Sequence, residues 1–327
     1  MRRWLAELGA GFVLGLRGLV AKEVRTRSRG WRGMWLLTVY LGLLAAAVCG
    51  LLALVVQASG TVPPQLGVAL FYALAIGAVL LLAFITPALT AGAISGERER
   101  RTLELLLVTR ASALGLAAGK LAGSLLYVVF LLVASLPAFT LVYLFGGVRL
   151  RYVAMVVAVA LVTALAHAAL GLLLSATIKR TGVATALAYV LVVVAVIGVP
   201  IGATAAATVR WTQDRGVGPP PLLAYVSPLP SLLSVLPGGN AGDSVPRVGL
   251  PALGIGARVP LAAPGPGPLP FTQSVYAVGA EQDPSRAELV VTWAPWVYHF
   301  VLSGAFVAGA LVLAALAITP LKPWRRR

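Results

Sequence analysis

Residues 94–120 read ISGERERRTLELLLVTRASALGLAAGK and form an island of charge inside an apolar chain. No charged residue occurs between Gly33 and Gly96, and none occurs between Lys120 and Arg149. A charged segment between two apolar runs of membrane-spanning length is typical of a loop at one membrane face. The island therefore predicts a membrane protein in which two successive spans are joined by a charged loop.

The composition of the whole chain supports this prediction. Of its 327 residues, 59% are hydrophobic and 11% are charged, whereas soluble domains carry about 25% charged residues. The net charge of +16 would suggest nucleic acid as the partner of a soluble protein. In a membrane protein, Lys and Arg gather in cytoplasmic loops, so we expect a lipid bilayer and no nucleic acid as the partner. The single cysteine, Cys49, cannot form an internal disulfide.

Six apolar segments come close to the twenty residues that a membrane span requires. They cover residues 35–57, 66–94, 121–145, 152–178, 184–208 and 289–318. The predicted fold is an all-α integral membrane protein with six transmembrane helices, an N-terminal interfacial helix and a long Pro/Gly-rich outside loop. The predicted regions are an interfacial helix at 1–32, five spans at 33–208, the outside loop at 209–288, and the sixth span with a basic tail at 289–327.

The two flanking features of this plan each leave an alternative open. Apolar residues recur at helical spacing between Leu5 and Leu19, which favours a helix lying on the membrane over a basic flank that only orients the first span. The 209–288 segment contains the run PGPGP at 264–268, which disfavours regular structure, and short strands are expected near 271–278. This segment is either an outside lid or partner-binding domain, or a poorly ordered insertion.

The distribution of positive charge predicts the orientation. Segments 2–32, 97–120, 179–180 and 322–327 fall on one side of a six-span arrangement and hold 19 of the 26 Lys and Arg residues. The positive-inside rule then places both termini and the 94–120 loop in the cytoplasm of a cell-membrane protein.

Residues that could supply chemistry on this chain are sparse. The sequence GLAAGKL at 115–121 is too short between its glycines for a phosphate-binding loop and has leucine where a hydroxyl should bind magnesium. Acidic and basic residues are missing from the depth of the spans, which counts against an ion-coupled carrier. His167 is expected to bond a neighbouring carbonyl, and His299 to lie near the outer interface. No metal-ligand spacing or nucleophile–base pair is present, so we expect no catalysis by this chain.

Three glycines at the start of the third span fit a structural role. Gly115, Gly119 and Gly123 are four residues apart and share one helix face, which favours close packing against another helix. The alternative is that glycine is simply common in membrane helices.

The 94–120 loop could instead receive energy by contact with another protein. Its alternating charges suit pairing with a partner, Thr102 could cap a short helix, and Glu104 would then lie in that helix's first turn. The alternative is a solvated loop that only orients the spans, although orientation requires Lys and Arg alone. The candidate contact residues are Glu97, Arg98, Glu99, Arg100, Arg101, Thr102, Leu103 and Glu104.

The sequence ISGERERRTLELLLVT, followed by Gly119-Lys120-Leu121, resembles the signature region of the type 2 ABC transporter permease family. That family's pattern is close to I-S-x-E-R-E-x-G-T-L-E-x-L-L-x-T-P, with G-K opening the next span. Two positions depart from it, since Arg101 stands where glycine is usual and Arg110 where proline is usual. The resemblance extends more loosely to the basic N-terminal helix, the six spans and the basic turn after the fourth.

This resemblance implies a non-catalytic permease subunit of an ABC exporter, with an elbow helix at the N-terminus and a coupling helix after the second span. ATP and magnesium would bind a separate cytoplasmic ABC ATPase subunit, and a second permease subunit would complete a homo- or heterodimer. The competing hypotheses are a membrane scaffold or assembly subunit that moves no cargo, and an ion-coupled carrier.

Overall fold

The computed structural model describes residues 31–59, 66–103, 113–144, 148–212, 222–236, 273–278 and 288–318. The predicted interfacial helix lies, apart from its last two residues, outside these ranges, as does the basic tail after Ile318. Both therefore stay predictions.

Six helical segments of the described chain are long and apolar enough to cross a membrane. This confirms the predicted all-α integral membrane fold. The spans are α2 (Trp31–Ser59), α3 (Leu66–Thr90), α6 (Ala113–Leu144), α7 (Leu150–Thr177), α8 (Thr181–Val193) continued by α9 (Val199–Thr212), and α11 (Pro295–Ile318).

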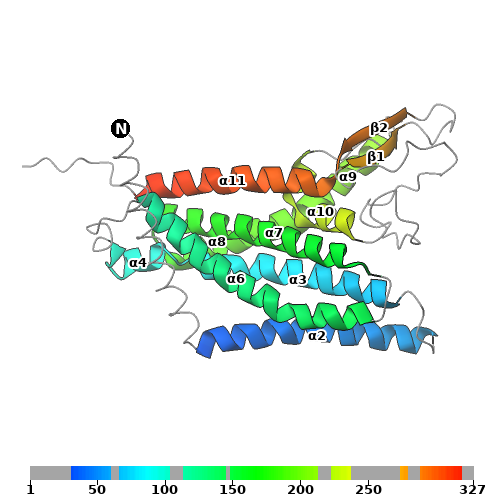
Figure 1. The fold of residues 1–327 in the computed structure, drawn as a ribbon. Helices are drawn as coiled ribbons and strands as arrows, with labels where there is room; N and C mark the ends of the chain where they lie inside the picture. The colour runs from blue at the N-terminus through cyan, green and yellow to red at the C-terminus, as the bar shows by residue number, and fades with distance from the viewer. Residues whose placement is uncertain are drawn as a thin grey trace, which may run out of the picture.

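The helices form a bundle with α3 and α7 at its centre (Figure 1). Helix α7 packs against α3, α6, α8 and α11, whereas α2 lies at the edge against α3 and α6. One apolar cluster joins α2, α3, α6 and α7 through side chains such as Leu44, Phe71 and Val156. Many other large apolar side chains are exposed, among them Trp35 and Leu54 on α2. A helical span satisfies its backbone internally, so these side chains can face lipid.

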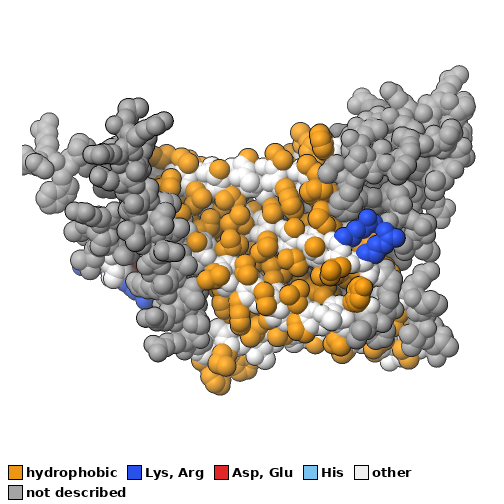
Figure 2. Space-filling view, in the orientation of Figure 1, with side chains coloured by type: hydrophobic (Ala, Val, Ile, Leu, Met, Phe, Trp, Pro, Cys, Tyr) orange, Lys and Arg blue, Asp and Glu red, His pale blue; other side chains and the backbone are white. Residues whose placement is uncertain are grey.

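On the face drawn in Figure 2, the charged side chains of the described residues lie at the two ends of the bundle, with a band of hydrophobic side chains between them. One end carries the short helix α4 (Ser95–Glu99), and we call it the α4 end. The other carries a two-stranded hairpin, and we call it the hairpin end (Figure 1). The described hairpin-end residues Arg149 and Arg151 flank the start of α7.

The hairpin pairs β1 (Gln273–Val278) with β2 (Glu288–Trp293) in antiparallel register, with Gln273 opposite Trp293. The predicted short strands near 271–278 are confirmed. The sixth span was placed too early, at residue 289, because its first residues form β2. Helix α11 begins at Pro295, where the ring suits the first helical turn.

Two short helices within 209–288 were not anticipated from the sequence. Helix η2 (Leu222–Val226) and α10 (Pro228–Val235) pack against α11, and Leu232 lies in the same apolar cluster as α3 and α7. The Ser227 side chain accepts from Leu229 N and caps α10, with Pro228 at its first position. Part of this proline-rich region, residues 222–235, is therefore helical and packs against the bundle.

The fifth span contains an irregular turn in which one backbone carbonyl accepts a hydrogen bond from Ser227. A π-helical segment, η1 (Val194–Gly198), joins α8 to α9, and Pro200 follows it. Proline has no N–H, so the helical donor to the Val196 carbonyl four residues earlier is missing. The Ser227 hydroxyl donates to that buried carbonyl at 3.5 Å. Helix α10 and the middle of the fifth span are thereby linked.

Candidate functional site: helix α4 and its anchors

Helix α4 lies directly beyond α3 and follows a turn at residues 91–94. Gly92 lets this turn pass close to the start of α8, and Gly96 of α4 also lies beside it. A Cβ atom at Gly92 would lie 3.1 Å from Thr181 Cγ2, and one at Gly96 would lie 3.9 Å from Thr181 Oγ1. The charged island is thus folded against the helical bundle.

A buried pair of serines joins α4 to α7. Ser175 Oγ accepts hydrogen bonds from the backbone N–H groups of Ile94 and Ser95, each at 2.9 Å. Ser95 Oγ lies 3.1 Å from Ser175 Oγ and donates to the Ala91 carbonyl at 3.2 Å. The Ser175 hydroxyl can then donate a hydrogen bond to Ser95 Oγ, so that both hydroxyl groups have an acceptor. Each serine is fully buried, so this contact holds the start of α4 in a dry site.

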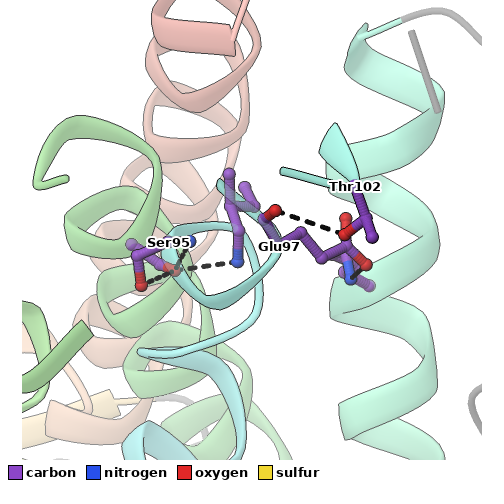
Figure 3. Close-up of polar contacts among 6 residues, drawn as sticks. Ser95, Glu97 and Thr102 are labelled. Atoms are coloured by element: carbon purple, nitrogen blue, oxygen red, sulfur yellow. Dashed lines mark hydrogen bonds and ion pairs between the residues drawn. The ribbon is translucent and has the colours of Figure 1, made fainter. Parts of the chain in front are cut away.

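An ion pair joins α4 to α6 on the other side (Figure 3). Lys120 Nζ lies 2.7 Å from Glu97 Oε1, with the side chains 6% and 22% exposed respectively. A nearly buried ammonium needs such a partner, which explains how Lys120 can lie within a membrane-spanning helix. The prediction began the third span after Lys120, whereas α6 begins at Ala113.

Two further contacts join α4 to the connection between α7 and α8. Arg98 Nη2 donates to the Ala176 carbonyl at 3.1 Å, near the end of α7. Glu99 Oε1 accepts from the backbone N–H of Thr181 at 2.7 Å, the first residue of α8. The first N–H groups of a helix lack partners within it, so Glu99 caps α8 from a distant part of the sequence. Helix α4 is therefore bound to three spans at once.

The end of α4 has the hydrogen bonds of a Schellman motif. Thr102 N donates to the Glu97 carbonyl at 2.9 Å, and Arg101 N donates to the Arg98 carbonyl at 3.1 Å. Between them, Arg101 has φ of 56°, the left-handed conformation that glycine adopts most readily. Arg101 is also where the type 2 pattern has glycine, so the bend that glycine would permit is made here by arginine.

A glycine on α7 completes the junction between α3 and α4. A Cβ atom at Gly171 would overlap Thr90 Oγ1 and lie 3.2 Å from Ala91 N. Near this junction, Ile94, Leu103, Leu116, Leu172 and Ala314 belong to one buried cluster that includes residues of α6, α7 and α11. The site is consequently packed as well as hydrogen-bonded.

The predicted contact residues thus divide into two groups. Glu97, Arg98 and Glu99 contact their own chain, and Leu103 is buried. Arg100 and Arg101 are exposed. Thr102 Oγ1 donates to the Glu97 carbonyl at 3.2 Å, whereas Glu104 and the helix that Thr102 was expected to cap lie outside the described residues. The proposed contact with a partner stays a prediction.

The three glycines singled out from the sequence are all buried on α6, and close packing there stays a prediction. They are Gly115, Gly119 and Gly123. Sequence analysis did not select Ser175, Thr181 or Gly171, which hold α4 from other helices. These are ordinary residues for a membrane helix, and only their position opposite α4 distinguishes them.

The two histidines have structural hydrogen bonds. His167 Nδ1 lies 2.7 Å from the Thr163 carbonyl, as expected. His299 is 1% exposed, with its two ring nitrogens beside the Tyr225 carbonyl at 2.9 Å and Thr163 Oγ1 at 3.1 Å. It therefore joins α11 to α7 and η2 within the bundle, and its expected position near the outer membrane interface stays a prediction. The part of the chain described by the structure contains no group of three His, Cys, Asp or Glu residues that could hold a metal ion.

This architecture defines a multi-pass membrane protein with a small polar helix clamped to one end of its bundle. The family described as ABC-2 family transporter protein matches residues 18–319, and the chain belongs to that family. It is accordingly an ABC transporter permease, the membrane subunit of such a transporter. The family implies association with an ABC ATPase subunit. Comparison with curated proteins gives no match.

Proposed function

We propose that this chain is the permease subunit of an ABC exporter, and that α4 is the element on which a separate cytoplasmic ATPase acts. The observation that carries the proposal is the simultaneous attachment of α4 to α6, α7 and the start of α8. A loop that served only to orient the spans would need no such attachment.

The anchors explain how a push on α4 would reach the bundle. Displacing α4 from α7 would leave the N–H groups of Ile94 and Ser95 without acceptors, and displacing it from α6 would leave the Lys120 ammonium unpaired. Both changes are costly, so α4 and the facing ends of these helices move together. Closure of the ATPase would then rock the spans, which is the mechanical step of transport.

The orientation follows the distribution of charge. The α4 end carries Lys179 and Arg180 in addition to the charged residues of α4. With the excess of Lys and Arg counted along the sequence, this end is cytoplasmic and both termini are inside. The α4 end is then accessible to a cytoplasmic ATPase.

The complete transporter would contain two permease subunits and two ATPase subunits. ATP and magnesium bind the ATPase subunits. This chain contributes the membrane-spanning route for the cargo and does not catalyse ATP hydrolysis. The cargo of the transporter is exported through the helical bundles of the two permease subunits.

The test is purification of the tagged full-length chain in mild detergent, with co-purifying proteins identified by mass spectrometry and ATP hydrolysis assayed. The proposal predicts an ABC ATPase with vanadate-sensitive turnover in the purified complex. Purification of the folded chain with a partner other than an ABC ATPase would favour the scaffold hypothesis and contradict the proposal.

A further inference from the structure

Two arginines at the end of α4 differ from its other charged residues. Glu97, Arg98 and Glu99 all contact atoms of α6, α7 or α8. Arg100 and Arg101 follow directly and are exposed, and the described chain gives neither side chain an acidic partner. The end of α4 therefore presents two adjacent guanidinium groups to its surroundings.

The backbone conformation of Arg101 is energetically unfavourable for a residue other than glycine. Its φ of 56° is the only positive φ of a non-glycine residue in the described chain. An L-residue in the left-handed region is disfavoured by about 1–2 kcal/mol, whereas glycine adopts it freely. The Schellman hydrogen bonds on both sides hold Arg101 in this conformation. A strained residue at a functional element is a reason to look for a role of its side chain.

We propose that Arg100 and Arg101 form a recognition pair for acidic side chains on the ABC ATPase, and that Arg101 helps to determine which ATPase this permease accepts. The inference rests on the proposed function. Arginine suits the role because its planar guanidinium can bind a carboxylate through two parallel hydrogen bonds. Arg101 is exposed in the turn that ends α4, the element on which the ATPase would act.

A protein surface fits this pair better than lipid headgroups do. Elements that lie on a membrane combine cations with exposed apolar side chains. Within residues 95–103, the exposed residues are Glu99, Arg100, Arg101 and Thr102, and the one leucine, Leu103, is 7% exposed. This part of α4 therefore offers charge and hydrogen bonds without an apolar surface for acyl chains.

The decisive variant is Arg101→Gly, because it relieves the backbone and removes the guanidinium. The ATPase that co-purifies with the wild-type chain would be titrated against full-length chain in nanodiscs of neutral phosphatidylcholine. We expect Arg101→Gly to unfold at the same or a higher temperature than wild type while its Kd for the ATPase rises about five- to ten-fold at low salt. The difference should shrink in about 0.5 M salt, where charges are screened.

Two companion variants sharpen the test. Arg101→Lys keeps the charge without the planar fork and should bind with intermediate affinity. Lys179→Ala removes one exposed cation from the turn between α7 and α8 at the same end and should change Kd by less than about two-fold.

Each contrary outcome has a separate meaning. Unchanged binding by Arg101→Gly, beside firm binding of wild type, would overturn the recognition role and leave the proposed function intact. Equal weakening by Lys179→Ala would overturn specificity in favour of general attraction. An effect of Arg101→Gly that is found only in nanodiscs containing phosphatidylglycerol would assign the pair to lipid. Failure of the wild-type chain to bind any ABC ATPase would overturn the proposed function together with this inference.

Discussion

Ser95 on α4 and Ser175 on α7 lie with their hydroxyl oxygens 3.1 Å apart, and both residues are fully buried although 80 residues separate them in the sequence. Ser175 also accepts the backbone N–H groups of Ile94 and Ser95. One small side chain thus fixes the entry into α4 against a central helix of the bundle. A stable contact at this point is what transmission of force from α4 to α7 requires.

Replacement of Ser175 by alanine should therefore destabilise the α4 end. Two buried N–H groups would lose their acceptor, at a cost of about 2–4 kcal/mol in the free energy of unfolding. Limited proteolysis and thermal unfolding in detergent would measure this loss. Ser124→Ala is the matched control, because the buried Ser124 hydroxyl donates only to carbonyls of its own helix. Equal stability of the two variants would contradict the anchoring role of Ser175.

The Glu97–Lys120 ion pair should respond unequally to removal of its two members. Glu97→Ala leaves a nearly buried ammonium unpaired and should cost about 3 kcal/mol of stability. Lys120→Met leaves the Glu97 carboxylate unpaired; that side chain is 22% exposed but its Oε2 atom is buried, so the loss should be smaller, at about 2 kcal/mol. Adding Lys120→Met to Glu97→Ala should recover part of the loss. A thermal-unfolding cycle of the four proteins checks this order, and additive losses would show that the pair is not coupled.

Gly171→Ala should disturb the junction between α3 and α4. The added methyl group would overlap Thr90 Oγ1, so α7 and the end of α3 must separate or Thr90 must move, at about 1–3 kcal/mol. Gly182→Ala is the control within α8, since a Cβ there meets no atom of the described chain within 4 Å and alanine favours helix. Comparison of their melting temperatures tests the account, which a tolerated Gly171→Ala would contradict.

Ser227→Ala should loosen the part of the fifth span that lies toward the hairpin end. The Val196 carbonyl would lose the hydroxyl that donates to it, so opening of α9 becomes easier by about 1 kcal/mol, or roughly five-fold in amide exchange. Hydrogen–deuterium exchange of peptides covering α9 measures this effect. Ser234→Ala is the control, because the Ser234 hydroxyl donates within α10 to the Ser231 carbonyl. Unchanged amide exchange in Ser227→Ala would show that the Ser227 hydrogen bond does not stabilise the fifth span.

The bundle could be predicted from the sequence because membrane spans are specified locally. Twenty apolar residues in succession allow few structures in lipid other than a helix, so the six spans and the position of the charged island follow from counting. The start of the sixth span was harder to predict, because Leu289 to Trp293 are apolar enough for a span yet pair as a strand with residues 273–278. Strand pairing depends on a distant segment, which local hydropathy does not report.

The contacts that the charged island makes within the fold were not foreseeable from the sequence, and its role as the site of a partner stays a prediction. The charges of Glu97 to Glu99 were interpreted as surface for a partner, whereas the structure uses them to bind Lys120, Ala176 and Thr181. Those contacts depend on how α4 lies against helices far along the chain. The left-handed turn at Arg101 was indicated only by the family pattern, which has glycine at this position, because an arginine itself gives no local signal for positive φ.

A disulfide between α4 and α7 tests the central claim, that these two elements move as one body when the ATPase works. Ser95→Cys/Ser175→Cys would be made in a Cys49→Ser background, because the native cysteine is exposed, and the bond would be verified by mass spectrometry. The reduced double-cysteine protein is the reference, because both samples lack the Ser175 hydroxyl that accepts from Ile94 N and Ser95 N. Vanadate-sensitive ATP hydrolysis by the complex in nanodiscs would then be measured in oxidised and reduced samples. We predict turnover equal within about two-fold, since the bond restrains a contact that does not change. Turnover that is abolished by oxidation and restored by dithiothreitol would mean that α4 must slide against α7, and would contradict the account.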